Sequence, residues 1–302
     1  MEIYEWEVLL LNHYMRAIGF SKISTKKEMD VLIGKALHLP TEKKSIKVGE
    51  KNTLVQVNKD FGPGIGLSVV GEYDEKGFLN VEYTFPYLRG GYGVNYNDIT
   101  IERHSDKEAY SGVCENINFG VSMIFYLQNL GEYVERYVYC SHHNEVARVV
   151  LAGLSKEGKV ILPIEKDETQ MELEQVGNEK RIQLIRAAKE GNIEALESLT
   201  LEDMDMYSLV SKRVKKEDIL SIVDSTFIPY GIESDHYSII GSILNVNPVY
   251  NLETGEMLYS LLIDCNQVIF DVCINSVDLL GEPVAGRRFK GVIWLQGKVD
   301  FL

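Results

Sequence analysis

The C-terminal stretch from residue 238 to residue 301 constrains the fold most strongly, because apolar and polar residues alternate there in closely spaced segments. Gly, Asn and Pro separate these segments, as in Asn251–Gly255 and Leu280–Pro283. Period-two apolar spacing between such breaks is typical of antiparallel strands. About five strands in so short a stretch must curl to protect their edges, so we expect a small antiparallel β-barrel.

Upstream of this stretch, the sequence predicts an antiparallel sheet with helices packed against one face. Residues 25–28 (Thr-Lys-Lys-Glu) have capping-box spacing and precede a helix that ends before Pro40. Asp74–Gly77 lies between two alternating segments and predicts a hairpin turn, and Ser155–Gly158 repeats this turn chemistry. The basic segment Lys43–Lys47 is typical of a solvated loop. Residues 133–140 fit either a strand or a helix, because composition favours one and apolar spacing the other.

An acidic segment at Glu165–Lys180 separates the two regions and precedes residues with helical spacing. Within that helical part, Ala187–Leu196 resembles half of an ankyrin repeat, but no second copy is present, so we expect a local helical hairpin. We therefore predict an α+β fold in three parts. They are an α+β domain at 1–165, an acidic linker and helical connector at 166–225, and a small β-barrel domain at 226–302.

Charge and composition indicate a cytoplasmic protein with no membrane partner, and they argue against nucleic-acid binding. The 302 residues carry a formal net charge of −14, which divides into −4 for residues 1–165 (18 bases, 22 acids) and −10 for the rest (13 bases, 23 acids). Nucleic-acid binding needs a surplus of Lys and Arg, which this chain lacks. The chain has no apolar run long enough for a membrane span, and its first residues are acidic where a secretory signal is basic. The four cysteines include no Cys-x-x-Cys pair, as expected for buried thiols in a reducing compartment.

One cluster has ligand-capable side chains, namely Cys140, His142, His143 and Glu145. Two adjacent histidines on a strand point to opposite faces, so a single zinc ion does not easily use both. A three-ligand site with Cys140 or Glu145 is one interpretation, and a Cys140 nucleophile with His142 as its base is another. No further His or Cys pair has ligand spacing, so a polar loop is the favoured interpretation, and we predict no metal and no cofactor.

Two further groups of residues are candidates for ligand binding. Tyr87, Tyr92 and Tyr96 lie around the glycine-rich segment 90–93, which lacks the spacing of a phosphate-binding loop. Near the C-terminus, Arg287, Arg288 and Lys290 are the basic residues available to a barrel face. The expected barrel resembles an oligonucleotide/oligosaccharide-binding (OB) fold in strand count, but from Thr226 onward nine acids face four bases. Trp294 lies in an apolar run and is expected in the core.

Three segments carry a family resemblance: Tyr14–Phe20, Ile228–Glu233 and Gly286–Gly297. Together they resemble an uncharacterised family of cytoplasmic proteins from clostridial (Firmicutes) bacteria, a domain of unknown function. The resemblance covers nearly the whole chain and implies a bacterial cytosolic protein. It carries no assigned activity, so it implies no role for any residue.

These observations favour a non-enzymatic binding or adaptor protein that recognises a protein or a small ligand. An enzyme of unknown class, metal- or thiol-dependent, would use the Cys140–Glu145 segment. Single-stranded nucleic-acid binding would use the C-terminal barrel. The sequence leaves both alternatives and the oligomeric state open.

Overall fold

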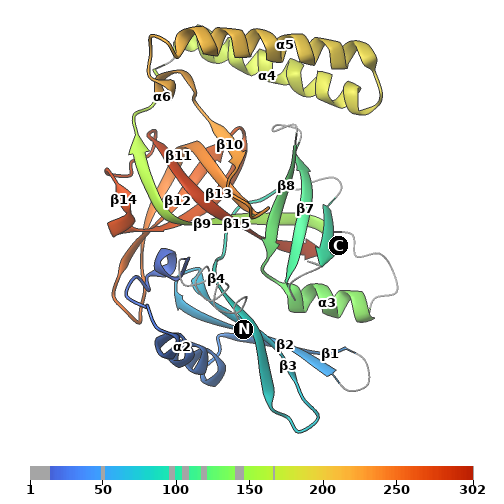
Figure 1. Ribbon diagram of the computed structural model, residues 1–302, viewed down its shortest axis with the longest axis vertical. Helices are drawn as coiled ribbons and strands as arrows, with labels where there is room; N and C mark the ends of the chain where they lie inside the picture. Colours follow the sequence, from blue (N-terminus) through green and yellow to red (C-terminus); the bar gives the residue numbers. More distant parts are fainter. Residues whose placement is uncertain are drawn as a thin grey trace.

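The computed structural model describes residues 14–48, 52–94, 99–103, 109–116, 121–139, 146–165 and 167–301 (Figure 1). Their strands form one sheet of four strands and one of eleven, so the fold is mixed α/β and dominated by strands. Near the start of the described residues, the short helix η1 (Arg16–Ile18) ends at Gly19, which has φ +90°.

The four-stranded sheet is an antiparallel meander in chain order. Its strands are β1 (Glu42–Val48), β2 (Asn52–Gly62), β3 (Ile65–Tyr73) and β4 (Leu79–Leu88). The predicted turn between β3 and β4 is confirmed. There the Asp74 carboxylate accepts hydrogen bonds from the backbone N–H groups of Lys76 and Phe78, at 2.9 and 2.8 Å, and Gly77 has φ +81°.

The prediction of a solvated loop at Lys43–Lys47 is wrong, because these residues form most of β1 and pair with β2. Ile46 is buried at 2% exposure while most of its neighbours on the strand face solvent. A charged strand at a sheet edge disfavours pairing with other chains. Its lysine-rich composition resembles that of a solvated loop, which explains why the prediction was wrong.

The eleven-stranded sheet combines strands from both halves of the chain. They are β5 (Gly93–Val94), β6 (Ile99–Arg103), β7 (Tyr110–Asn116), β8 (Val121–Leu127), β9 (Val146–Ile161), β10 (Thr226–Pro229), β11 (His236–Tyr250), β12 (Met257–Cys265), β13 (Val268–Asn275), β14 (Leu279–Leu280) and β15 (Arg288–Phe301). The main path runs β10-β11-β12-β13-β9-β15-β8-β7-β6.

A closed circuit of strand pairs lies within this sheet. β11 pairs with both β12 and β15, β12 pairs with β13, β13 pairs in parallel with β9, and β9 pairs along most of its length with β15. The C-terminal strands therefore do not form a sheet of their own, because β9 comes from upstream of residue 165. The parallel pairing of β9 covers an edge of β13 that would otherwise be open.

The expected OB-like barrel within residues 226–302 is accordingly not confirmed. The sheet also continues from β15 to β8, β7 and β6, and so passes through both boundaries of the three-part division. The division itself stays a prediction.

The strand β9 also corrects the turn predicted at Ser155–Gly158, since β9 continues through these residues. Ser155 is fully buried, and its hydroxyl donates to the carbonyls of Glu157 and Val292 at 2.9 Å each. Opposite this point the register of β15 shifts between Gly291 and Ile293. Residues typical of a turn thus form a local bend in a long strand, where a bulge re-aims the chain.

The described helices other than η1 are α2 (Lys26–His38), α3 (Leu130–Tyr139), α4 (Glu168–Lys189), α5 (Ile193–Arg213), α6 (Ile219–Ile222) and the short helix η2 (Ser276–Asp278). Thr25 and Glu28 form the predicted capping box at the start of α2, and residues 133–139 are helical. The acidic segment is part of α4 from Glu168 onward. No helix in the described part of the chain is both long and apolar enough to span a bilayer.

The predicted helical hairpin is present as α4 and α5, which project from one end of the molecule (Figure 1). Asn192 caps α5 by accepting a hydrogen bond from the N–H of Ala195 at 3.1 Å. Thr200 lies inside α5, where its hydroxyl donates to the carbonyl of Leu196 at 2.8 Å. That local bond satisfies the side chain without ending the helix.

The two sheets meet through aromatic side chains and amide contacts. The ring of Tyr126 on β8 lies 4.9 Å from Phe85 on β4 and 5.0 Å from Trp294 on β15, measured between centroids. Trp294 is 6% exposed, as expected for a core residue. The Gln296 amide on β15 donates to the carbonyl of Pro86 on β4 at 2.8 Å. This contact positions the cleft described next.

Candidate functional site

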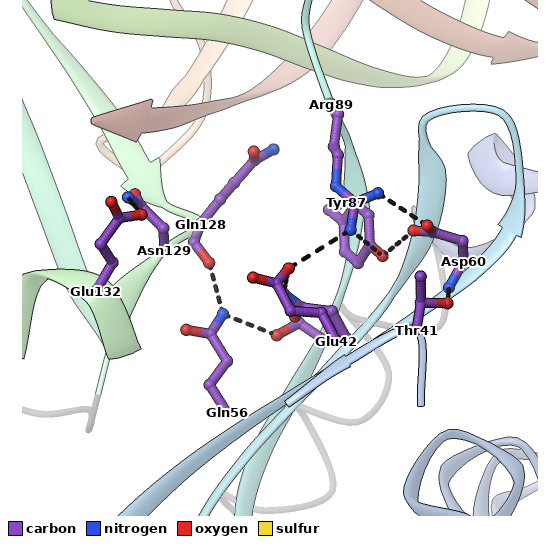
Figure 2. A network of polar contacts seen from close by, with 11 residues as sticks. Thr41, Glu42, Gln56, Asp60, Tyr87, Arg89, Gln128, Asn129 and Glu132 are labelled. Atoms are coloured by element: carbon purple, nitrogen blue, oxygen red, sulfur yellow. Dashed lines mark hydrogen bonds and ion pairs between the residues drawn. The ribbon is translucent and has the colours of Figure 1, made fainter. Parts of the chain in front are cut away.

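A polar cleft of about 130 Å³ lies where the four-stranded sheet meets the β8–α3 junction (Figure 2). All of its lining residues are polar: Glu42, Lys44, Gln56, Asn58, Tyr87, Arg89, Gln128, Asn129, Glu132 and Lys298. They come from β1, β2, the end of β4, the turn after β8, the first turn of α3, and β15. We call this the polar cleft. A concave site with convergent polar groups is the usual form of a small-molecule site.

Amide side chains form the floor of the cleft. Gln56 on β2 donates to the backbone carbonyl of Gln128 at 2.6 Å and to the hydroxyl of Ser68 at 3.1 Å. Its carbonyl oxygen accepts from the N–H of Gly131 at 2.8 Å, which fixes the start of α3. The Gln128 side chain donates to Gln296 and to the carbonyl of Leu88, both at 2.8 Å. These hydrogen bonds tie both sheets together and leave the floor rigid.

A charged wall stands beside this floor. Asp60 accepts from the hydroxyl of Tyr87, and its other oxygen accepts from Arg89 at 2.8 Å. The Arg89 guanidinium also lies over the Tyr87 ring at 5.1 Å from the centroid, and it is 3.9 Å from a Glu42 oxygen. Burial, followed by the hydrogen bond to Asp60, raises the pKa of Tyr87, so its hydroxyl stays a proton donor. Burial lowers the pKa of Arg89, but the Tyr87, Asp60 and Glu42 groups outweigh this and raise it.

Asn58 on β2 lines the cleft and has an acceptor without a partner in the described chain. Its amide nitrogen donates to Glu42 at 3.3 Å, while its side-chain oxygen is buried and has no hydrogen-bond partner in the described part of the chain. Exchanging the two atoms would set an oxygen against the Glu42 carboxylate, so the acceptor must be the inner atom. A buried acceptor without a partner costs about 1–3 kcal/mol. A donor brought by a ligand would remove that cost.

Of the tyrosines predicted to line a ligand groove, Tyr87 lies in the cleft. Tyr92 is 50% exposed next to β5 and does not line it. Tyr96 lies outside the described residues, as do Cys140, His142, His143 and Glu145. The interpretations of that last cluster stay predictions. Among the described residues, no group of three or more His, Cys, Asp or Glu side chains is placed to hold a metal ion.

The three basic residues near the C-terminus do not share one free surface. Arg288 is 3% exposed, and its guanidinium donates to four backbone carbonyls: Leu162 at 2.9 Å, Leu220 at 2.6 Å, Val223 at 2.8 Å and Asp224 at 3.3 Å. Burial lowers its pKa, partly offset by the Asp224 carboxylate. Arg288 therefore has a structural contact network, whereas Arg287 and Lys290 are partly exposed.

A second buried polar cluster surrounds Asp235. One carboxylate oxygen of Asp235 lies 2.8 Å from His236 Nδ1, and the other accepts from Trp294 Nε1 at 2.8 Å. The ring of Tyr14 packs against His236 at 5.4 Å, and its hydroxyl has no partner among the described residues. The Asp–His pair thus anchors the core tryptophan.

Sequence reasoning missed Asn58 and Gln56. The usable signal was Gln56 itself, since a polar residue inside the apolar run Leu54–Val57 is informative when the strand is buried. Glu42, Arg89 and Lys298 carry no such signal. Only the fold brings them together.

The fold and the cleft define a mixed α/β protein with a small polar site between two sheets. A family model described as "Domain of unknown function, E. rectale Gene description (DUF3881)" matches residues 15–297, and the chain belongs to this family. The predicted resemblance to a family of unknown function is confirmed. No curated protein matches the chain, and no solved structure matches it.

Proposed function

We propose that this protein is a non-enzymatic, cytoplasmic binding protein whose polar cleft holds a small molecule with an N–H donor group. The observation that carries the proposal is the buried Asn58 oxygen, an acceptor without a partner in the described chain. Buried polar atoms are almost always hydrogen-bonded, so this one calls for a donor from outside the chain.

The surrounding charges suit a small zwitterion. The carboxylate of Glu42, which accepts a hydrogen bond from the Asn58 amide, favours an ammonium group beside Asn58. Lys44 and Lys298, which also pair with Glu135 and Asp300, line the same cleft and favour a carboxylate on the ligand. The volume of 130 Å³ is room for about four water-sized groups. An amino acid of the size of glycine is therefore the class of ligand that fits.

The circuit β11-β12-β13-β9-β15 supports an OB-like barrel as the scaffold of this binding protein. Its pairs are antiparallel except β13–β9, and five strands that pair in a circle leave no open edge within it. Lys298 of the polar cleft lies on β15, a strand of this circuit. In this proposal the barrel arises from 146–161 together with the C-terminal strands.

The proposal can be tested by saturation-transfer NMR and calorimetry on the full chain with glycine, sarcosine and betaine. Betaine has the same charges as glycine but no N–H donor, and sarcosine is bulkier than glycine but keeps two donors. We expect glycine and sarcosine to bind and betaine not to bind. Equal binding of betaine, or no binding of glycine or sarcosine at millimolar concentration, contradicts the proposal.

Two variants provide the matched comparison. Asn58→Ala removes the acceptor and should weaken glycine binding about tenfold, as expected for one hydrogen bond. Asn52→Ala changes an exposed asparagine on the same strand and should leave binding unchanged. Circular dichroism of both variants checks that the fold is intact.

The alternative functions have less support. The enzyme hypothesis depends on residues 140–145, which lie outside the described part of the chain. Nucleic-acid binding would need Arg288 on the surface, but its guanidinium is buried against backbone carbonyls, and the net charge is −14.

A further inference from the structure

The outer helix of the hairpin, α5, carries a row of exposed apolar side chains. Its members, with their exposed fractions, are Ile193 at 71%, Leu196 at 58%, Met204 at 64%, Tyr207 at 76% and Val214, just after the helix, at 42%. Together with Thr200 and Ser211 they follow each other at intervals of three or four residues. At 100° per residue this spacing places all seven on one side of the helix, and we call this row the α5 stripe.

Among the described residues, one side of α5 is covered by another element of the chain. α4 packs against the side that contains Ala195, which is 4% exposed. Ion pairs from Lys180 to Glu202 and from Arg181 to Asp203 fasten the two helices together. The stripe lies away from the side that contains Ala195, with Asp203 beside one of its edges. A row of apolar side chains at three- and four-residue intervals is the seam of a coiled coil or a helical bundle, and here it has no partner within the described chain.

The charges beside the stripe are divided along the helix. Glu194 and Glu197 stand near its start, and Lys212 and Lys215 stand at its end. At 100° per residue all four lie on the same side of the stripe. None of them forms an ion pair within the part of the chain that the structure describes. A partner helix should therefore place positive charges by the start of α5 and negative charges by its end.

An antiparallel second copy of α5 meets this requirement. Two helices related by a twofold axis present the same side to each other, so the acidic start of each faces the basic end of the other. In that arrangement Ile193 lies near the partner's Val214 and Met204 lies near the axis. In a parallel copy the acidic residues of both helices would lie at the same end of the pair and meet no basic residues.

We propose that two copies of this chain associate through the α5 stripe in antiparallel orientation, so that two α4–α5 hairpins form a four-helix bundle. The acidic residues beside the start of α5 and the basic residues beside its end favour a second copy as the partner and an antiparallel orientation of its helix. This interface is separate from the polar cleft, so it does not depend on the proposed ligand.

Analytical ultracentrifugation of the full chain tests the association. The chain has a mass of 34.2 kDa, and we expect a species of twice that mass at micromolar concentration. A double variant, Leu196→Glu with Met204→Glu, should be monomeric. Leu209→Glu is the matched control, because Leu209 is 57% exposed on the same helix but lies off the stripe. A monomeric wild type, a dimeric double variant, or a monomeric Leu209→Glu overturns the proposal.

Charge reversal tests the orientation. Replacing Glu194 and Glu197 together by Lys should weaken the dimer, since it sets two lysines near the partner's Lys212 and Lys215. Adding Lys212→Glu and Lys215→Glu to the same chain should restore the dimer, because all four charges beside the stripe are then reversed and each again faces its opposite. A structural effect of either pair of substitutions would not be rescued by the other pair. A dimer that is insensitive to the two Glu→Lys substitutions, or that the two Lys→Glu substitutions do not restore, overturns the antiparallel arrangement.

Discussion

Replacing Arg288 should destabilise the protein more than replacing any partly exposed arginine. Its guanidinium donates to Leu162, which follows β9, and to Leu220, Val223 and Asp224, which precede β10. One side chain thus holds both ends of the segment that contains α4, α5 and α6. The carbonyls at the end of α6 are those that a helix leaves unpaired, and a cation suits that position.

The expected magnitude follows from these contacts. A hydrogen bond to a charged group contributes about 1.5–3 kcal/mol, but the released carbonyls are partly exposed and regain water. We therefore expect Arg288→Met to lower the free energy of unfolding by about 3–5 kcal/mol, well short of the sum of four bonds. Arg288→Lys should lose a smaller part of this, because an ammonium group keeps the charge but cannot reach four carbonyls as a planar fork does.

Urea unfolding followed by circular dichroism measures this loss. Arg287→Met is the control, since Arg287 is partly exposed and donates only to the carbonyl of Glu282 in its own loop, at 2.9 Å. It should cost less than about 1 kcal/mol. Hydrogen exchange should also accelerate at residues 219–224 in Arg288→Met. A loss below 1 kcal/mol for Arg288→Met, or an equal loss for both variants, would refute the reasoning.

Three further predictions concern the packing at a buried glycine, the reactivity of the buried thiols, and whether the C-terminal residues fold alone. A Cβ at Gly297 would lie 2.3 Å from Phe125, so Gly297→Ala should cost about 1–3 kcal/mol in urea unfolding, whereas Gly177→Ala, at an open helical position, should not destabilise. Burial raises the pKa of the three buried cysteines to about 12, so in a Cys140→Ser variant they should not react with DTNB at pH 8 until the protein is unfolded. Because unfolded thiols ionise near pH 8.5, stability should be complete below that pH and fall above it, by up to about 1.4 kcal/mol per pH unit for each thiol; a constant urea midpoint from pH 8 to 10 would be inconsistent. Residues 226–302 expressed alone lack β9 and should be unfolded by circular dichroism, and a cooperative transition would argue against the shared circuit.

Local signals predicted the elements whose geometry depends on neighbouring residues. The capping box at Thr25 and the hairpin turn at Asp74–Gly77 are satisfied by atoms within four residues, so the sequence contains the whole explanation. The C-terminal strands were also predicted, because the alternation of apolar and polar residues along them is strong. The turn predicted at Ser155–Gly158 failed because its residues are held by Val292, far along the chain.

Strand partners and the polar cleft could not be predicted in this way. The parallel pair of β9 and β13 joins Ala152 to Asp271, and no local pattern specifies such a choice. In the cleft, Tyr87 was a candidate because of nearby tyrosines, whereas Asn58 gains its importance from Glu42 and from the turn after β8. These contacts depend on how the two sheets meet, and no local pattern of residues indicates that.

The position of the α4–α6 segment explains how the hairpin can carry an interface of its own. Within the strand circuit, β9 precedes residues 162–225 and β11 follows them, so the segment is an excursion from the circuit and not one of its strands. Arg288 lies on β15, a strand of the circuit. Its hydrogen bonds to Leu162 and Leu220 attach both ends of this excursion to the circuit. The hairpin can then pair with a second copy without altering the register of the strands. Weakening the Arg288 contacts should therefore loosen the attachment of the α4–α5 hairpin to the strand circuit while the α5 stripe stays intact. The stability of this attachment can thus be measured separately from the strength of the proposed dimer.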